Sequence, residues 1–252
     1  MSNLVVLIMA GGLGKRMNSN LPKVLHNICG KPMLIHIIEQ AFLLSPIKIG
    51  IIVGKYKDII KQTLLNYISL ENIEFISQNE PLGTGHAIQC CIHELQKYTN
   101  SNVIILSGDV PMLKSVTMRE MTTNVNKVKI MTTEFDNPTG YGRIIERNNL
   151  FVKIIEEKDC DQTQKQIRKI NCGIYTFNTE ILCKYLMDLT NNNSQGEYYL
   201  TDIIEIIRMR ENIDIEMLNI ETHKHNEITG INTVEQLLEL EKLMEIQKLM
   251  MI

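Results

Sequence analysis

The sequence predicts an α/β fold, in which a doubly wound, mostly parallel mixed sheet is followed by a C-terminal helix. Three observations predict it. Short apolar runs alternate with amphipathic helical patterns through the first half of the chain, which is typical of repeated strand–helix–strand units. The first apolar run leads directly into a glycine-rich turn, as happens where a parallel strand meets the next helix. The chain is 252 residues long, enough for one sizeable core.

The first half of the chain alternates strictly. Strands are predicted at residues 4–9, 47–53, 73–77 and 103–107, and helices at residues 32–44, 57–67 and 84–97. In sheets of this kind, ligands bind beyond the carboxyl ends of the strands. We therefore expect the glycine turn after the first strand and Asp109 after the last to share one pocket.

The second half is less regular. Strands are predicted at residues 127–133, 143–146, 151–156 and 173–177, and helices at residues 179–189 and 200–210. From Val234 to about residue 250 the sequence is one charged helix, in which the apolar residues Leu237, Leu240 and Met244 share a face, with Leu238 beside them. We predict two parts, a domain over residues 1–230 and the C-terminal helix over residues 231–252.

Charge and composition exclude several classes of protein. The net charge is only −3, so bulk binding to nucleic acid is not expected. The first residues carry no basic stretch, and the apolar run over Leu4–Met9 is too short for a signal peptide or a membrane span. The six cysteines show no paired spacing, which favours reduced thiols. We expect a cytoplasmic protein without nucleic-acid or membrane partners.

The turn after the first strand combines glycines with cations: Gly11, Gly12, Gly14, Lys15, Arg16 and Lys23. It is not a P-loop, because Lys15 is followed by Arg16 rather than by serine or threonine, and Met17 stands where the dinucleotide fingerprint needs its third glycine. Glycines let the backbone approach an anion closely, and the cations add charge. A solvated basic loop is the alternative, but the cluster favours a phosphate-binding turn of a third kind.

Two further segments carry polar groups near predicted strand ends. Asp109 follows an apolar strand, where a carboxylate can hold Mg²⁺ over bound phosphates; the alternative is a turn-capping aspartate before Pro111. Gln78 and the glycines around Thr84 precede a helix and can bring polar groups to a base edge. The alternative for Thr84 is an ordinary N-cap. His86 by itself is interpreted as a packing residue rather than a catalytic base.

Hydrogen-bonding groups without nucleophiles dominate the second half. They include Gly142, Glu156, Asn171 and the polar loop over residues 191–199. This set suits a polyhydroxy or amide-bearing ligand, although a solvated surface loop explains the asparagine run equally well. Nothing resembles a Ser/His/Asp triad, a reactive Cys/His pair or the close carboxylates of glycoside chemistry.

Five motifs, at residues 21–26, 82–87, 108–111, 137–143 and 195–202, resemble those of the sugar-phosphate nucleotidyltransferases. The chain resembles the uridylyltransferase domain of the bifunctional bacterial enzymes that make UDP-N-acetylglucosamine, and the similarity runs from about Val5 to about Leu240. It implies the Rossmann-like nucleotidyltransferase fold. In those enzymes the loop that matches residues 195–202 borders the pocket for the N-acetyl group.

The resemblance implies a role for each matching residue. The nucleotide would contact Ala10, Gly11, Gly12, Gly14, Gln78, Gly83, Thr84 and Gly108, with Gln78, Gly83 and Thr84 reading uracil. Arg16 and Lys23 would be catalytic, because they neutralise the triphosphate and the developing charge. Mg²⁺ would be bound by Asp109 and Asn232. The sugar would contact Gly142, Glu156, Asn171 and Tyr198.

The activity implied is transfer of UMP from UTP to N-acetylglucosamine 1-phosphate, with release of pyrophosphate. The alternatives are a different sugar 1-phosphate as acceptor, or a non-catalytic subunit that binds nucleotide sugars. Two residues depart from the family pattern: Lys15 replaces a usual threonine, and Ser107 replaces a frequent aromatic residue. No β-helix acetyltransferase domain follows the C-terminal helix, so we expect uridylyl transfer without acetyl transfer. The oligomeric state stays open between a monomer and a dimer formed through that helix.

Overall fold

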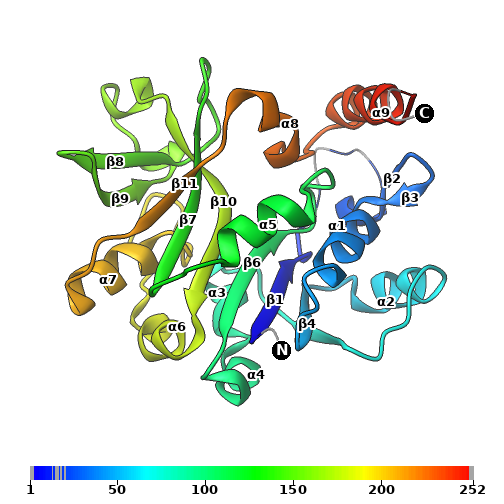
Figure 1. The fold of residues 1–252 in the computed structure, drawn as a ribbon, viewed down its shortest axis with the longest axis horizontal. Coiled ribbons are helices and arrows are strands. Elements are labelled where there is room, and N and C mark those ends of the chain that lie inside the picture. Colours follow the sequence, from blue (N-terminus) through cyan, green and yellow to red (C-terminus); the bar gives the residue numbers. More distant parts are fainter. Residues whose placement is uncertain (1–2, 13, 15–16, 18, 20, 250–252) are drawn as a thin grey trace.

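The computed structural model describes residues 3–12, 14, 17, 19 and 21–249. Within this part of the chain, nine strands form one mixed sheet with the order β11-β7-β10-β6-β1-β4-β5, and the β8–β9 hairpin joins it at β10 (Figure 1). A separate two-stranded ladder pairs β2 with β3. The predicted α/β class with a mostly parallel mixed sheet and a C-terminal helix is therefore confirmed.

The parallel half of the sheet is built from the first apolar runs. Its strands are β1 (Leu4–Met9), β4 (Lys48–Val53), β5 (Ile73–Ser77) and β6 (Asn102–Ser107). Val5 pairs with Lys48 on one side and with Val103 on the other, so β1 lies in the middle of this half. Because β1 is covered on both faces, almost all of its side chains are buried, as its unbroken apolar run predicts.

Helices cover both faces of the sheet. One core lies under α1 (Met33–Phe42), α2 (Lys57–Leu65) and α5 (Ser115–Thr122) and receives Val6 and Ile8 of β1. The other core lies under α3 (Thr84–Gln89), α4 (Ile92–Leu95), α6 (Thr179–Tyr185) and α7 (Asp202–Glu211) and receives Val5 and Leu7. Neighbouring residues of β1 thus point into opposite cores, which is the two-residue period of a strand.

The second half of the chain extends the sheet mainly with antiparallel pairs, although its last strand runs parallel to its neighbour. Its strands are β7 (Val128–Glu134), β8 (Arg143–Arg147), β9 (Leu150–Ile155), β10 (Lys169–Asn178) and β11 (Glu216–Asn219). β10 runs antiparallel to both β6 and β7, and its register with β7 shifts between Asn171 and Tyr175. This irregularity lies where β10 borders the site described below.

The C-terminal helix α9 (Val234–Leu249) packs on the short ladder of β2 (Asn27–Ile28) and β3 (Lys31–Pro32). Leu237 and Leu240 are only 8% and 3% exposed and join a third apolar cluster, whereas Leu238 is 52% exposed. Met244 packs partly against the same cluster, so the predicted apolar face is confirmed. Glu241 adds a polar contact, because its Oε1 accepts a hydrogen bond from the Cys29 amide at 2.7 Å.

Several elements differ from the sequence predictions. The strand over residues 73–77 has the predicted bounds, but the helix predicted over residues 84–97 is divided into α3, α4 and the 3-10 helix η3 (Gln96–Tyr98). The division follows from 3-10 bonding at Cys91, whose amide donates to Ile88 O at 2.9 Å. α5, β11, the β2–β3 ladder and α8 (His225–Ile228) were not predicted, because they are short or only half-buried.

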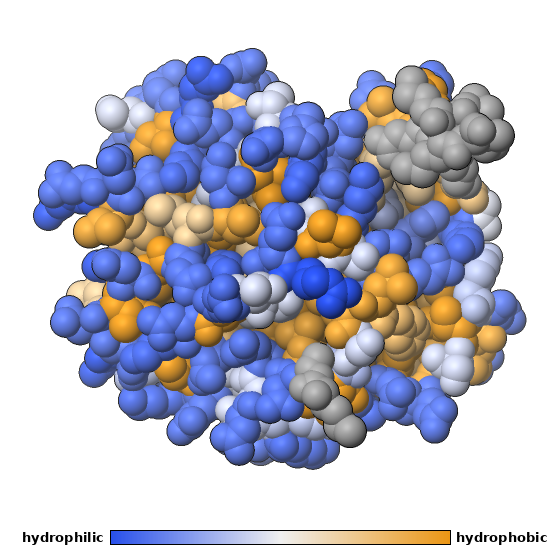
Figure 2. Space-filling model, viewed as in Figure 1, coloured by the Kyte–Doolittle hydropathy of each residue, from blue (hydrophilic) through white to orange (hydrophobic). Residues whose placement is uncertain are grey.

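Single 3-10 turns connect several elements: η2 (Lys23–Leu25), η4 (Glu157–Asp159), η5 (Gln164–Gln166), η6 (Leu186–Asp188) and η7 (Thr222–Lys224). The face of the molecule in Figure 2 is largely hydrophilic, with apolar residues scattered singly or in small groups. None of the described helices combines the length and the apolar character that crossing a membrane requires.

Candidate active site

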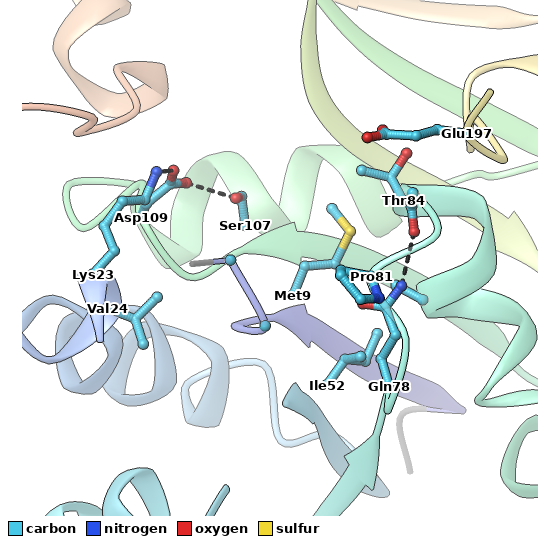
Figure 3. Close-up of a pocket in the computed structure, with 14 residues that line it drawn as sticks. Met9, Lys23, Val24, Ile52, Gln78, Pro81, Thr84, Ser107, Asp109 and Glu197 are labelled. Carbon is cyan, nitrogen blue, oxygen red and sulfur yellow. Dashed lines mark hydrogen bonds and ion pairs between the residues drawn. The ribbon is translucent and has the colours of Figure 1, made fainter. Parts of the chain in front are cut away.

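Two adjoining cavities lie at the carboxyl ends of the central strands. The first has a volume of about 260 Å³ and lies among the ends of β1, β4, β5 and β6 (Figure 3). The second has a volume of about 420 Å³ and lies toward β9 and β10. Four residues line both cavities: Met9, Thr84, Ser107 and Asp109. The predicted shared pocket of the glycine turn and Asp109 is thus present, at the edge of the sheet where α/β proteins bind ligands.

The glycine turn after β1 forms one side of the first cavity. Gly11 and Gly12 line it. A Cβ atom at Gly11 would lie 3.4 Å from the Gly54 amide nitrogen and 3.6 Å from Gln78 Oε1. These are ordinary contact distances, so the segments after β1, β4 and β5 lie side by side at this point.

Gln78 and Gly83 form the opposite side of the first cavity. Gln78 extends from the end of β5 toward the loop before α3 (Figure 3), and its Nε2 donates to Gly83 O at 3.0 Å. The same Nε2 lies 3.2 Å from His86 Nδ1. Gly83 has a φ of +112°, and a Cβ atom there would lie 2.5 Å from Tyr198 O, so this position requires glycine.

Tyr198 holds this loop with its main chain. Its amide donates to Leu82 O at 2.8 Å, and its carbonyl accepts from the Gly85 amide at 2.7 Å. Its ring lies 6.3 Å from the His86 ring, measured between centroids, and packs against the core beneath α3. Tyr198 is not among the residues that line either cavity, and its main-chain contacts support the loop before α3.

Thr84 is not the N-cap of its helix. Gly83 occupies that position, and the Thr84 hydroxyl oxygen instead accepts a hydrogen bond from the Leu200 amide at 3.0 Å. The N-cap alternative is therefore wrong. The hydroxyl joins the start of α3 to the segment before α7, and Thr84 lines both cavities at this junction.

Lys23 and Asp109 form a half-buried ion pair where the cavities meet. Lys23 Nζ contacts Asp109 Oδ2 and also donates to Asn232 Oδ1 at 2.9 Å (Figure 3 shows the first contact). The two charged side chains are 14% and 16% exposed. Ser107 Oγ donates to the other carboxylate oxygen, Oδ1, at 2.6 Å. Both oxygens of Asp109 are thus held in defined positions.

Local structure holds each member of this group in place. Lys23 begins the 3-10 helix η2, directly after Pro22, and a Cβ atom at Gly14 would lie 2.8 Å from Lys23 Cβ. The loop that carries Asn232 is tied to Asp109, because the Ile231 amide donates to Asp109 O at 2.9 Å. Gln236 Oε1 then accepts from the Asn232 amide at 2.7 Å.

The oxygens around Lys23 fit a magnesium ion. Asp109 offers a carboxylate and Asn232 an amide oxygen, and both already accept from one cation, the Lys23 ammonium group. Mg²⁺ takes one or two protein oxygens and completes its shell with water and phosphates. Across the described residues, no group of three or more His, Cys, Asp or Glu side chains forms an alternative metal site.

The second cavity presents fixed polar groups. Glu156 Oε1 accepts from the Thr201 hydroxyl at 2.9 Å, and burial raises the pKa of Glu156 against the opposing effect of this hydrogen bond. Asn171 Nδ2 donates to the Tyr175 hydroxyl at 2.7 Å, and Asn171 Oδ1 accepts from the Gly173 amide at 3.1 Å. Donors and acceptors of this kind suit a ligand rich in hydroxyl and amide groups.

A buried ion pair supports the loop between β7 and β8, which borders this cavity. The Arg143 side chain is 1% exposed, and its Nη2 lies 2.7 Å from Glu157 Oε2. The same Glu157 oxygen accepts from the Gly140 amide at 3.2 Å. Arg143 also donates to Tyr141 O. The arginine of this predicted motif thus orders the loop from beneath and does not reach the cavity.

The polar loop over residues 191–199 is held to the rest of the molecule through Asp159. That carboxylate accepts from the Ser194 amide at 2.9 Å and from the Tyr199 hydroxyl at 3.1 Å, and these hydrogen bonds lower the pKa of Asp159 against its partial burial. Gln195 Nε2 donates to the same hydroxyl at 2.8 Å. Most of the loop's polar groups therefore bond within it, and Glu197 alone of these residues lines the first cavity.

The structure brings most of the predicted site residues together. The first cavity is lined by Gly11, Gly12, Lys23, Gln78, Gly83, Thr84 and Asp109, and the second by Thr84, Asp109, Gly142, Glu156, Asn171 and Asn232. Like Tyr198, the described residues Ala10, Gly14 and Gly108 line neither cavity. Arg16, the second predicted catalytic residue, lies outside the described residues, as does Lys15.

Those three residues have backbone roles around the site. The Ala10 amide donates to Ile52 O at 2.8 Å, and the Gly108 amide donates to Met9 O at 2.9 Å. A Cβ atom at Gly108 would lie 3.1 Å from Val24, so this glycine lets the segment of Lys23 pack close to the strand end. Gly14 likewise lets the chain pack close to Lys23, because a Cβ atom there would lie 2.8 Å from Lys23 Cβ.

Sequence reasoning missed three supporting groups. Ser107 was noted only as a departure from the family pattern, yet its hydroxyl orients Asp109. Thr201 holds Glu156, and Gln236 holds Asn232. No local pattern marks such residues, because each acts on a partner that is distant in the chain or beyond a turn. Proximity to a motif is the only available signal, since Ser107 and Thr201 each lie within or beside one.

The chain is similar to known nucleotidyltransferases over almost its whole length. Residues 5–239 match the family described as nucleotidyl transferase. A probable UDP-N-acetylglucosamine pyrophosphorylase of Acanthamoeba polyphaga mimivirus is 43% identical over 241 residues, which cover 93% of each chain. The bifunctional protein GlmU of Gloeothece citriformis is 41% identical, over 93% of this chain and 51% of its own. The chain thus spans about half the length of the GlmU relatives it matches.

Solved structures show the same fold at low sequence identity. A UDP-glucose pyrophosphorylase complexed with UDP-glucose aligns with a TM-score of 0.75 at 17% identity, covering 98% of this chain and 100% of its own. The inositol-1-phosphate CTP transferase from T. maritima aligns with a TM-score of 0.69 at 14% identity, covering 94% and 96%.

Proposed function

The chain belongs to the nucleotidyl transferase family, and we propose that it transfers UMP from UTP to N-acetylglucosamine 1-phosphate, releasing pyrophosphate. One observation carries the proposal: the cavity of about 260 Å³ beside the glycine turn and the polar second cavity meet at the Lys23–Asp109 pair. A nucleotidyl transfer needs such an arrangement, because two phosphorylated substrates must be held together where an ammonium group and a bound metal ion would offset their negative charge.

The nucleotide would occupy the first cavity. Its base would lie against Gln78 and Gly83, and its phosphates would extend along Gly11 and Gly12 toward Lys23. The sugar would occupy the second cavity, with hydroxyl and acetamido groups near Glu156 and Asn171. The sugar phosphate then points to the junction of the two cavities, where it faces the α-phosphorus.

The reaction needs little covalent help from the protein. A phosphate oxygen of the sugar phosphate forms a bond to the α-phosphorus, and the bond from the α-phosphorus to the bridging oxygen breaks, so that pyrophosphate leaves with the electron pair. The nucleophile is already anionic, and no general base is required. The residues at the junction contribute by positioning and by charge, which are the main terms in phosphoryl-type transfers.

Asp109 and Asn232 would hold Mg²⁺, which when bound neutralises phosphate charge and orients the reacting groups. Ser107 keeps the Asp109 carboxylate in place for this role. Lys23 contacts the same two side chains, so it must release them before they can bind a metal ion. Its ammonium group is then available to the phosphates in the first cavity, which Lys23 also lines.

The choice of acceptor rests on the relatives and on the second cavity. The mimivirus relative is named for UDP-N-acetylglucosamine, and its identity of 43% extends over 93% of this chain. Asn171 presents an amide and Glu156 a half-buried carboxylate with a raised pKa. These groups can pair with the N–H and C=O of an acetamido substituent, which glucose 1-phosphate lacks.

Pyrophosphate release tests the proposal directly. With UTP and Mg²⁺ held constant, we expect N-acetylglucosamine 1-phosphate to react faster than glucose 1-phosphate or galactosamine 1-phosphate by at least an order of magnitude, the discrimination typical of a site built to bond a polar substituent. Equal rates with all three acceptors would contradict the acceptor assignment. No pyrophosphate from any acceptor, with UTP still bound, would favour a non-catalytic nucleotide-sugar-binding subunit.

A further inference from the structure

We propose that His86 is a positioning residue: it fixes the orientation of the Gln78 side-chain amide and thereby makes the first cavity select uracil over cytosine. The inference rests on the uridylyl transfer proposed above and goes beyond it, because His86 lies outside the lining of both cavities. It acts on the base through Gln78.

The contacts of Gln78 determine which end of its amide faces the ligand. Nε2 lies 3.0 Å from Gly83 O and 3.2 Å from His86 Nδ1. An amide nitrogen carries two hydrogens and accepts no hydrogen bond. Both hydrogens of Nε2 are therefore bonded within the protein, one to the carbonyl and one to the imidazole.

The same contacts assign the state of His86. Because Nε2 of Gln78 only donates, Nδ1 of His86 must accept, and the imidazole is neutral with its hydrogen on the other nitrogen. That nitrogen, His86 Nε2, faces the Cys90 sulfur at 3.9 Å. Burial raises the pKa of the Cys90 thiol, so the sulfur is uncharged and can accept weakly.

The remaining polar atom of Gln78, Oε1, faces the glycine turn. It lies 3.6 Å from the position that a Cβ atom would take on Gly11, at the boundary of the first cavity. Oε1 can only accept a hydrogen bond. Uracil offers a donor at N3, whereas cytosine has a lone pair there, so an amide held in this orientation attracts one base and repels the other.

His86 holds the amide more firmly than Gly83 alone. Without the imidazole, one N–H of Gln78 loses its partner in a half-buried position, and the amide can rotate to present that N–H to the ligand. Cytosine would then be accepted more easily. The His86 side chain is itself held in place. Its ring packs near Tyr198, and the helix that carries it follows Gly83, whose backbone conformation is restricted.

Equilibrium binding of UTP and of CTP, measured by calorimetry without a sugar phosphate, tests the inference. We compare the wild type with His86→Leu, which removes the acceptor, and with His86→Asn, whose Oδ1 retains an acceptor near the Nδ1 position. His93→Leu is the matched control, since His93 is an exposed histidine on the neighbouring helix α4. Circular dichroism establishes that each variant is folded.

We expect His86→Leu to lower the UTP preference, expressed as the ratio of the two dissociation constants, by about tenfold, the scale of one hydrogen bond. His86→Asn should return the ratio to within about threefold of the wild type, and His93→Leu should leave it unchanged. If His86→Leu weakens UTP and CTP binding equally, His86 only packs, and the inference is overturned.

The two proposals fail in different ways. UTP preference that depends on His86, without transfer to N-acetylglucosamine 1-phosphate, would defeat the proposed function and support the inference. Transfer to that acceptor with a UTP preference unaffected by His86→Leu would defeat the inference and leave the proposed function intact.

Discussion

At the residue scale, the Lys23 ammonium group is held by the two oxygens that the proposed reaction needs for a metal ion. Its contacts with Asp109 and Asn232 keep one positive charge at the junction of the cavities. The carboxylate is therefore compensated in the free protein, which avoids the cost of a half-buried unpaired charge. On substrate binding we therefore expect a metal ion to replace the Lys23 ammonium group at Asp109, so that no new charged site has to form.

Lys23→Ala should have two opposite effects. Turnover should fall by about 10²-fold or more, the scale observed when one preorganised charged donor is removed. Binding of Mn²⁺ to the free protein, followed by electron paramagnetic resonance, should instead become tighter, because Asp109 and Asn232 no longer contact the ammonium group.

Lys97→Ala is the control for that experiment, because Lys97 forms a surface ion pair with Glu94 far from the site. It should change neither quantity. Turnover of Lys23→Ala within a factor of two of the wild type would remove Lys23 from the mechanism, and unchanged Mn²⁺ affinity would show that its contacts with Asp109 do not compete with a metal.

At the element scale, α7 and β9 bring several carboxylates together behind the second cavity. Glu156, Asp159, Asp202 and Glu205 line one depression there. Burial, with the nearby carboxylates of Glu156 and Glu205, raises the pKa of Asp202 from its usual 3.8 to about 6. The packing of this helix on the sheet thus places an unfavourable charge at the start of α7 at neutral pH.

Asp202→Asn should stabilise the protein at pH 7. A carboxyl group with a raised pKa in the folded state holds an extra proton when folded, so the folded state loses stability as pH rises from about 4 to about 6. Discounted for solvent screening, the gain is about 1 kcal/mol, which corresponds to a melting temperature higher by roughly 2–4 °C.

Thermal melts at pH 7 and at pH 4 check this prediction. Most of the difference between Asp202→Asn and the wild type should disappear at the lower pH, where Asp202 is protonated in the folded state and about half protonated in the unfolded state. A difference that is equal at the two pH values would mean that the amide acts by packing and not by charge.

The terminal helix α9 offers a second test at this scale. Leu240→Ala should lower the free energy of unfolding by about 2–5 kcal/mol, because it removes a buried side chain from the cluster that joins α9 to β2 and the start of α1. Leu238→Ala, at an exposed position of the same helix, should change it by less than about 0.5 kcal/mol. Equal losses in urea denaturation would contradict the assigned face.

At the scale of the whole molecule, the parallel half of the sheet supplies the first cavity and the antiparallel extension supplies much of the second. They meet where β6 and β10 run side by side. A ligand that occupies both cavities therefore joins the two halves of the sheet. Under the proposed function, a nucleotide sugar would occupy both cavities, whereas UDP would occupy only the first and a sugar phosphate only the second.

UDP-N-acetylglucosamine should therefore raise the melting temperature more than UDP does at equal concentration, since a ligand stabilises the protein by its affinity for the folded state. Asn171→Ala should remove the excess and keep the effect of UDP, whereas Gln78→Ala should reduce both. An equal effect of the two ligands on the wild type would mean that the second cavity does not bind the sugar.

Local patterns predicted the first half of the fold well, because apolar runs and helical periods depend on neighbours in the chain. Ile73–Ser77 has the predicted bounds. The helix predicted over residues 84–97 did not form as one piece: the Cys91 amide makes a 3-10 bond to Ile88 O, and the Cys91 side chain is buried in the core. β11 is a half-buried edge strand, and its sequence carries too little apolar signal to be recognised.

The sequence by itself determined the fold class, the strand ends that carry the site and the motifs that indicate a nucleotidyl transferase. Tertiary structure alone decided which groups touch. Lys23 lies 86 positions from Asp109 and 209 positions from Asn232, and their contact depends on how the whole sheet and α9 close around them. The main chain of Tyr198 bonds to Leu82 and Gly85 for the same reason. Contacts over such separations follow from topology, which no local pattern contains.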